Sequence, residues 1–209
     1  MIEKQMWSGR DRSISNNLDV QSNNDASKDY ESPIDIVEND IYFYQAVNQK
    51  SILSLVKSIR STENVMITKG LQLGIDPPPI RVHILSGGGT IFAGLAGMDI
   101  IKNSRVPIHT YVEGFVASAG TFLSVVGQKR YIYRHSYMLI HQLSNVTWGN
   151  YQQLTDDYKN STELMKKIKE IYKQYTKVPM KEIDQILQHD LYWDAEKCKE
   201  YGLVDEIIG

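Results

Sequence analysis

The sequence contains one cysteine, six prolines and no long apolar run among its 209 residues. A single cysteine, Cys198, excludes an internal disulfide and a zinc site built from several cysteines, and it predicts a reducing, cytoplasmic setting. An apolar stretch without charge, residues 114–128, has only fifteen residues, whereas a membrane-spanning helix needs about 20. We therefore expect neither a disulfide framework nor a membrane span.

An excess of either charge sign is also missing. The 23 Lys and Arg residues face 25 Asp and Glu residues, so the net charge is −2, and this balance predicts no nucleic-acid partner. Residues 1–33 hold four basic and six acidic side chains, which leaves the remainder of the chain neutral. That first segment is rich in Ser and Asn and has no apolar period, so we predict that residues 1–33 are disordered and that residues 34–209 form one domain.

Alternating apolar patterns within residues 34–209 predict an α/β fold with a largely parallel sheet. A loop is expected over residues 64–79, because two glycines there precede three consecutive prolines. Strands are expected over 41–44, 80–85, 106–112, 131–133, 137–141 and 203–208. Helices are expected over 51–61, from the glycine run to about 103, over 117–126 and 149–175, and after Pro179 and Asp194.

The glycine run at residues 87–89 separates a predicted strand from a predicted helix. It is not a dinucleotide fingerprint, because Phe92 stands at the third glycine position, and the sequence has no P-loop motif. The run is either a tight turn or a set of backbone N–H groups directed at a developing negative charge. Ser118 has two similar interpretations, since it is either the N-cap of the next helix or a nucleophile that needs a base.

Among five histidines, His141 is the best candidate for that base. His83 and His109 lie within predicted strands and are expected to be structural. His141 ends an apolar strand, and active sites of α/β proteins gather at the carboxyl ends of strands. A hydrogen-bonded structural histidine remains the alternative, and no histidine has the spacing of a metal site.

Four segments, in this order, resemble the proteolytic subunit of the Clp protease, ClpP, over about residues 38–208. The segments are Ser86-Gly-Gly-Gly89, Val116-Ala-Ser-Ala-Gly120, Met138-Leu-Ile-His-Gln142 and Glu200-Tyr-Gly-Leu-Val-Asp205. The resemblance implies a ClpP/crotonase-like fold of repeated β-β-α units with a protruding long handle helix. It implies a catalytic triad of Ser118 as nucleophile, His141 as general base and Asp190 as third member, with Asp184, Asp194 and Asp205 as rivals to Asp190. It also implies an oxyanion hole formed by the backbone N–H groups of Gly89 and Ala119.

By the same resemblance, the chain is a serine endopeptidase subunit that cleaves unfolded polypeptides inside a closed shell. Heptameric rings, stacked in pairs as a tetradecamer, are expected, together with a separate AAA+ unfoldase of the Clp type that uses ATP. No cofactor is expected in this chain. Two other functions remain open: a catalytically weak or scaffolding subunit of a mixed ring, and a crotonase-type coenzyme A thioester enzyme, which uses carboxylates as acid and base.

The predicted long helix bears on this assembly, because apolar residues follow one another at steps of three and four from Tyr151 to Tyr175. Such a seam either packs on the core of its own subunit or joins two rings. Two departures from the family pattern affect these expectations. Gly87 stands where the family has a proline, which implies a looser turn. His189 stands where the family has an arginine that takes part in contacts between the two rings, which implies a weaker or pH-sensitive assembly.

Overall fold

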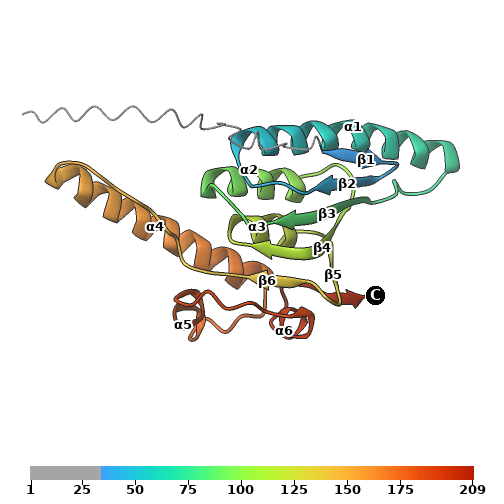
Figure 1. Ribbon diagram of the computed structural model, residues 1–209. Helices are drawn as coiled ribbons and strands as arrows, with labels where there is room; N and C mark the ends of the chain where they lie inside the picture. Colours follow the sequence, from blue (N-terminus) through green and yellow to red (C-terminus); the bar gives the residue numbers. More distant parts are fainter. Residues whose placement is uncertain (1–33) are drawn as a thin grey trace, which may run out of the picture. The chain divides into compact units, whose positions relative to one another are not determined.

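A seven-stranded sheet forms the centre of the computed structural model, which describes residues 34–209 (Figure 1). The prediction for residues 1–33 lies outside the described residues. The strands run in the order β1-β2-β3-β4-β5-β7, with β6 also paired to β4, and every pair is parallel except β1–β2. Their bounds are Asp35–Val37 (β1), Asp40–Phe43 (β2), Ile80–Ser86 (β3), Ile108–Ala117 (β4), Lys129–Tyr133 (β5), Tyr137–Leu139 (β6) and Glu206–Ile208 (β7).

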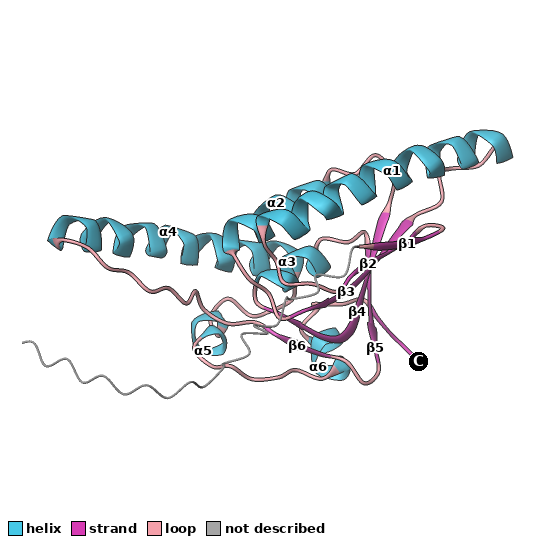
Figure 2. Cartoon of the chain, turned by 45° about the horizontal axis from the view of Figure 1, so that its top comes forward, coloured by secondary structure: helices cyan, strands magenta, loops and turns pink. Residues whose placement is uncertain are grey.

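Three helices cover one face of this sheet, as Figure 2 shows for α1, α2 and α3. The helices are Gln49–Leu73 (α1), Ile91–Lys102 (α2), Ala119–Val125 (α3), Tyr151–Tyr175 (α4), Ile183–Leu187 (α5) and Ala195–Glu200 (α6). Alternate strand residues such as Ile41, Phe43, Val82 and Ile84 are fully buried and form the core with these helices. The predicted α/β fold with a largely parallel sheet is confirmed. None of the helices within residues 34–209 is both long and apolar enough to cross a bilayer.

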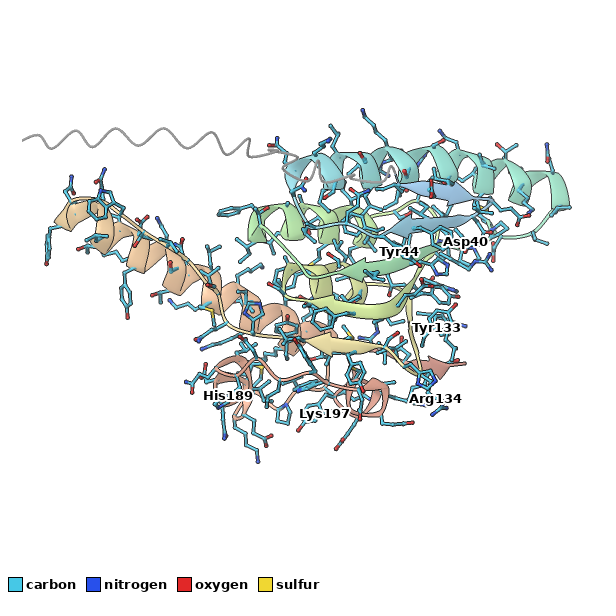
Figure 3. All side chains as sticks on the ribbon, in the orientation of Figure 1. Asp40, Tyr44, Tyr133, Arg134, His189 and Lys197 are labelled. Carbon is cyan, nitrogen blue, oxygen red and sulfur yellow. The ribbon has the colours of Figure 1, made fainter. Side chains whose placement is uncertain are left out.

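The opposite face of the sheet carries a ladder of stacked rings. Tyr42, His83, Tyr111 and Tyr131 pair in register across β2, β3, β4 and β5, with ring centroids 4.7–4.8 Å apart. Tyr44, Tyr133 and Asp40 lie on the same side of the sheet (Figure 3). The two ring nitrogens of His83 lie 2.6 Å from Glu113 and 3.0 Å from Asp40, so His83 is a sheet histidine, as its position in the sequence predicts.

The loop predicted over residues 64–79 is wrong in its first part, because α1 continues to Leu73. Gly70 lies inside the helix, where a Cβ atom would come within 2.9 Å of the Ile75 carbonyl oxygen, so this glycine permits a close approach. Gly74, with φ 66°, ends the helix in the left-handed conformation that favours glycine. Gly70 therefore permits close packing inside α1, Gly74 ends that helix, and the three prolines follow its end.

Strand β4 also continues past its predicted end at Val112. Ile84 pairs with Val112, but Ser86 pairs with Val116, so β4 contains extra residues opposite β3. Gly114 lies in this bulge with φ 59°. Before the bulge β4 pairs with β5, and beyond it β4 pairs with β6. The bulge therefore brings β6 beside the final residues of β4, immediately before Ser118.

Helix α4 begins and ends close to the predicted limits, and its two halves have different surroundings. Its buried residues are Ile168, Ile171 and Tyr172, all in the second half. In the first half, Tyr151 is 85% exposed and Tyr158 is 76% exposed. Figure 1 shows this first half extending away from the sheet. The second half of the apolar seam therefore packs on the subunit's own core, and the first half presents aromatic side chains to the outside.

Candidate active site

Ser118 lies between the end of β4 and the start of α3, with φ 54° and ψ −130°. A serine with positive φ is uncommon, because such a conformation costs about 1–3 kcal/mol and persists only where the surrounding structure holds it. Ser118 occupies the N-cap position of α3, but its side chain accepts no capping hydrogen bond from that helix. The N-cap interpretation is therefore wrong for the hydroxyl group, which remains available for chemistry.

Neighbouring backbone groups hold both peptide groups of Ser118. Its N–H donates to the carbonyl oxygen of Leu139 in β6 at 3.0 Å, and its carbonyl oxygen accepts from the N–H of Thr121 at 2.9 Å. The glycine run packs directly behind it, because a Cβ atom on Gly88 would lie 2.6 Å from the Ser118 Cβ atom. The strained serine is thus enclosed by β6, α3 and the turn that follows β3.

The pairing of β4 with β6 brings His141 to Ser118. Ala117 pairs with Leu139, so the chain beyond β6 passes Ser118 and reaches His141 two residues later. Both side chains line one pocket of about 610 Å³. Among the described residues, no hydrogen bond joins the Ser118 hydroxyl group to the imidazole ring. The structure therefore places nucleophile and base candidates in one pocket without the contact that proton transfer requires, a common state of catalytic pairs without substrate.

Asp190 is the nearest of the four candidate carboxylates to His141. Its Oδ1 atom lies 4.0 Å from His141 Nδ1, which is an ion-pair distance and too long for a hydrogen bond, and its side chain is 80% exposed. The residue before it is His189, which is also exposed (Figure 3). The third member of the predicted triad is therefore near the base without yet orienting it.

The three rival aspartates have other partners. Asp194 caps α6 by accepting the N–H of Lys197 at 2.9 Å, and Asp184 pairs with Lys169. Asp205 is held by the N–H and guanidinium groups of Arg130, which also donates to the carbonyl oxygens of Tyr175 and Gly202. Burial acts to raise the pKa of Asp205, but the Arg130 guanidinium outweighs it and lowers that pKa. These contacts assign the rivals to capping and ion pairing.

Gly89 and Ala119, the predicted oxyanion-hole residues, line the same pocket as Ser118 and His141. Val47 donates to the Gly88 carbonyl oxygen and accepts from the Thr90 N–H, both at 2.8 Å, so the Gly89 N–H faces away from Val47. A Cβ atom on Gly89 would lie 2.1 Å from the Val47 carbonyl oxygen, which excludes any larger residue. Ala119 is the first residue of α3, and a first-turn N–H has no partner within its helix.

The rest of the pocket is mainly apolar. Its apolar lining residues come from the segment between β2 and α1, from α2, α3 and α4, and from the segment after β6: Val47, Ile91, Phe92, Phe122, Leu143, Leu164, Ile168 and Tyr172. Among residues 34–209, no aspartate or glutamate lines this pocket. Within residues 34–209, no group of three or more His, Cys, Asp and Glu side chains gathers as a metal site. The pocket can therefore receive an apolar group beside Ser118.

Sequence reasoning missed two hydroxyl groups that join this site. The Thr121 hydroxyl group contacts both the Ser118 carbonyl oxygen and the phenol of Tyr172. Tyr172 belongs to the apolar seam of α4, but nothing in the sequence relates it to Thr121, 51 residues earlier.

Comparisons with known proteins identify the family and the fold. The family model described as Clp protease matches residues 37–209. Among solved structures, a point mutant of ClpP1 from Listeria monocytogenes superposes with a TM-score of 0.71 and 22% sequence identity, covering 82% of this chain and 91% of that chain. The structural likeness shows that the fold is that of ClpP. Because the family model spans nearly all of residues 34–209, the chain belongs to the Clp protease family of serine-type peptidases.

Proposed function

We propose that this chain is the serine endopeptidase subunit of a self-compartmentalised protease that cleaves unfolded polypeptides. One observation supports it above all others: Ser118 has a strained backbone, a hydroxyl group free of any capping role, and His141 in the same pocket. Strain of this kind is concentrated at functional sites, where the surrounding structure holds it.

In the proposed reaction, His141 removes the hydroxyl proton of Ser118 while the oxygen attacks the carbonyl carbon of the peptide bond. The N–H groups of Gly89 and Ala119 stabilise the resulting oxyanion, each contributing on the order of 3 kcal/mol. The protonated His141 then donates its proton to the departing amine, which leaves an acyl-Ser118 ester. Water hydrolyses this ester with His141 again acting as base. Asp190 closes from 4.0 Å to hydrogen-bond distance and stabilises the protonated imidazole.

Two exposed features of the single subunit support the proposed assembly. Asp190 is largely exposed, and within residues 34–209 the aromatic side chains in the first half of α4 are exposed as well. We infer that heptameric rings, stacked in pairs through α4, cover these surfaces and tighten the triad. A separate AAA+ unfoldase of the Clp type, which uses ATP, supplies unfolded chains in the cytoplasm, and this chain itself uses no cofactor.

Turnover of a short fluorogenic peptide with an apolar side chain tests the proposal. We expect Ser118→Ala to abolish turnover and labelling by a fluorophosphonate, because both require the nucleophile. Ser144→Ala is the matched control, since Ser144 is exposed and lines the same pocket. Labelling of Ser118→Ala at the rate of the parent chain would refute the mechanism. A stable monomer at micromolar concentration, seen by light scattering, would refute the assembly.

The two alternatives predict different results in the same assay. A scaffolding subunit would form rings and show neither turnover nor labelling. A coenzyme A thioester enzyme would turn over thioesters after Ser118→Ala, because its acid and base are carboxylates. The absence of aspartate and glutamate from the lining of the Ser118 pocket disfavours that second alternative.

A further inference from the structure

Two side-chain hydroxyl groups and the backbone carbonyl group of Ser118 form a continuous chain of hydrogen bonds behind the candidate nucleophile. The Thr121 hydroxyl oxygen lies 2.6 Å from the Ser118 carbonyl oxygen and 2.7 Å from the Tyr172 phenol oxygen. Thr121 is fully buried and Tyr172 is 1% exposed, so water does not compete for these contacts. We call this chain the hydroxyl bridge, Tyr172–Thr121–Ser118.

The direction of each hydrogen bond follows from the protons available. The Ser118 carbonyl oxygen can only accept, so Thr121 donates its single hydroxyl proton to it. The Thr121 oxygen must then accept from the phenol of Tyr172. Burial raises the pKa of Tyr172, so the phenol keeps the proton that it donates. Together with the Thr121 N–H at 2.9 Å, the Ser118 carbonyl oxygen therefore accepts two hydrogen bonds.

The position of this carbonyl group also determines the direction of the N–H group in the same peptide bond. The Ser118 C=O and the Ala119 N–H belong to one planar trans peptide and point in opposite directions. A carbonyl group held toward Thr121 in the interior therefore turns the Ala119 N–H away from the interior. Ala119 lines the Ser118 pocket, so the hydroxyl bridge sets the direction of a proposed oxyanion-hole donor.

We propose that Thr121 and Tyr172 are positioning residues, which hold the Ser118–Ala119 peptide in the orientation needed to stabilise the oxyanion. This inference rests on the proposed serine peptidase function. It also connects catalysis to α4, because Tyr172 is one of the buried residues of that helix and its phenol contacts Thr121. Neither residue contacts the reacting atoms, so each acts through the peptide that it holds.

Four single variants test the hydroxyl bridge. Tyr172→Phe and Thr121→Val each remove one hydroxyl group and keep the shape of the side chain, whereas Thr121→Ser retains the hydroxyl group. Tyr175→Phe is the matched control, because this phenol lies on the same helix and its ring contacts Lys102 outside the bridge. One buried hydrogen bond corresponds to about a three- to tenfold change in rate.

We expect Tyr172→Phe and Thr121→Val to lower kcat about three- to tenfold with KM within about twofold, because the pocket keeps its shape. Thr121→Ser should recover most of the rate, and Tyr175→Phe should resemble the parent chain. The double variant should be no worse than the more impaired single variant, because both break the same chain. Equal losses in Tyr172→Phe and Tyr175→Phe, or a loss that appears only in KM, would overturn the proposal.

A second readout does not depend on activity. Amide hydrogen exchange over residues 117–123 should be faster in Tyr172→Phe and Thr121→Val than in the parent chain, with Tyr175→Phe unchanged. If the parent chain neither turns over peptide nor reacts with a fluorophosphonate, the proposed function fails, and exchange alone decides whether the bridge holds Ser118. Unchanged exchange in both bridge variants would refute the inference even if the peptidase is active.

Discussion

Replacement of Glu63 by glutamine should destabilise the subunit strongly, although this residue is remote from the active site. The Glu63 side chain is fully buried in α1 and accepts hydrogen bonds from the Arg60 guanidinium, the Ser104 hydroxyl group, and the N–H and guanidinium of Arg105. These contacts join α1 to the connection between α2 and β4. The glutamine amide has no charge and leaves two guanidinium groups without their anion.

The size of the effect follows from the pKa of Glu63. Burial acts to raise that pKa, but hydrogen bonds from Arg105, Arg60 and Ser104 outweigh it and lower the value from 4.5 to about 2. This difference corresponds to about 3 kcal/mol of folding free energy. Both arginines are partly exposed, so solvent screening reduces our expectation to about 2–3 kcal/mol for Glu63→Gln at pH 7.

The pH dependence has a definite sign. Because folding lowers the pKa, the contribution is complete above about pH 4.5 and is lost as the pH falls toward 2. Urea unfolding at a fixed protein concentration should therefore show a difference between parent and Glu63→Gln that shrinks to roughly half or less near pH 3. Glu170→Gln is the control, since Glu170 is 67% exposed beside Lys167 and should change stability by less than about 0.5 kcal/mol. A difference below that size at pH 7, or one that is constant with pH, would refute the reasoning.

Three further outcomes are expected. Gly88→Ala should abolish peptide turnover and fluorophosphonate labelling, because the new Cβ atom would lie 2.6 Å from the Ser118 Cβ atom and 2.7 Å from the Ala117 carbonyl oxygen; retained turnover would contradict this contact. Tyr158→Lys should shift light scattering toward smaller species without lowering the melting temperature of the dissociated subunit, because Tyr158 is 76% exposed in one subunit. Cys198 should resist a thiol reagent at pH 7 until the protein unfolds, because it is fully buried and burial raises its pKa to about 12; rapid modification of the folded chain would show that α6 opens.

The sequence predicts most strands because apolar alternation and turn residues are local signals. It fails along α1, where Gly70 and Gly74 look like one loop but have different roles inside and at the end of a helix. It also ends β4 too early, because a glycine bulge within a strand has the same local signature as a turn. Both errors arise where tertiary packing decides the conformation of a glycine.

The sequence likewise predicts some residues of the candidate site and misses others. Ser118 and His141 can be singled out from the sequence because each lies at the end of a strand. Their proximity depends on the pairing of β6 with β4. The order of strands along the chain does not reveal this pairing, because β5 comes between β4 and β6. The assignment of Asp190 rests on family resemblance, and the structure adds the separate partners of its three rivals. The Thr121–Tyr172 contact joins residues 51 positions apart and had no sequence signal at all.

Helix α4 has a thermodynamic consequence for a freshly made subunit. An isolated helix is marginal in water below about 12–15 residues. Within residues 34–209, the first half of α4 is stabilised mainly by local contacts: the Asn150 capping box and the pairs that Asp156 makes with Gln152 and Lys159. Its helix content should therefore follow mass action: dilution melts the first turns while the sheet stays folded, and association restores them. Helicity measured against protein concentration then becomes a direct titration of subunit pairing.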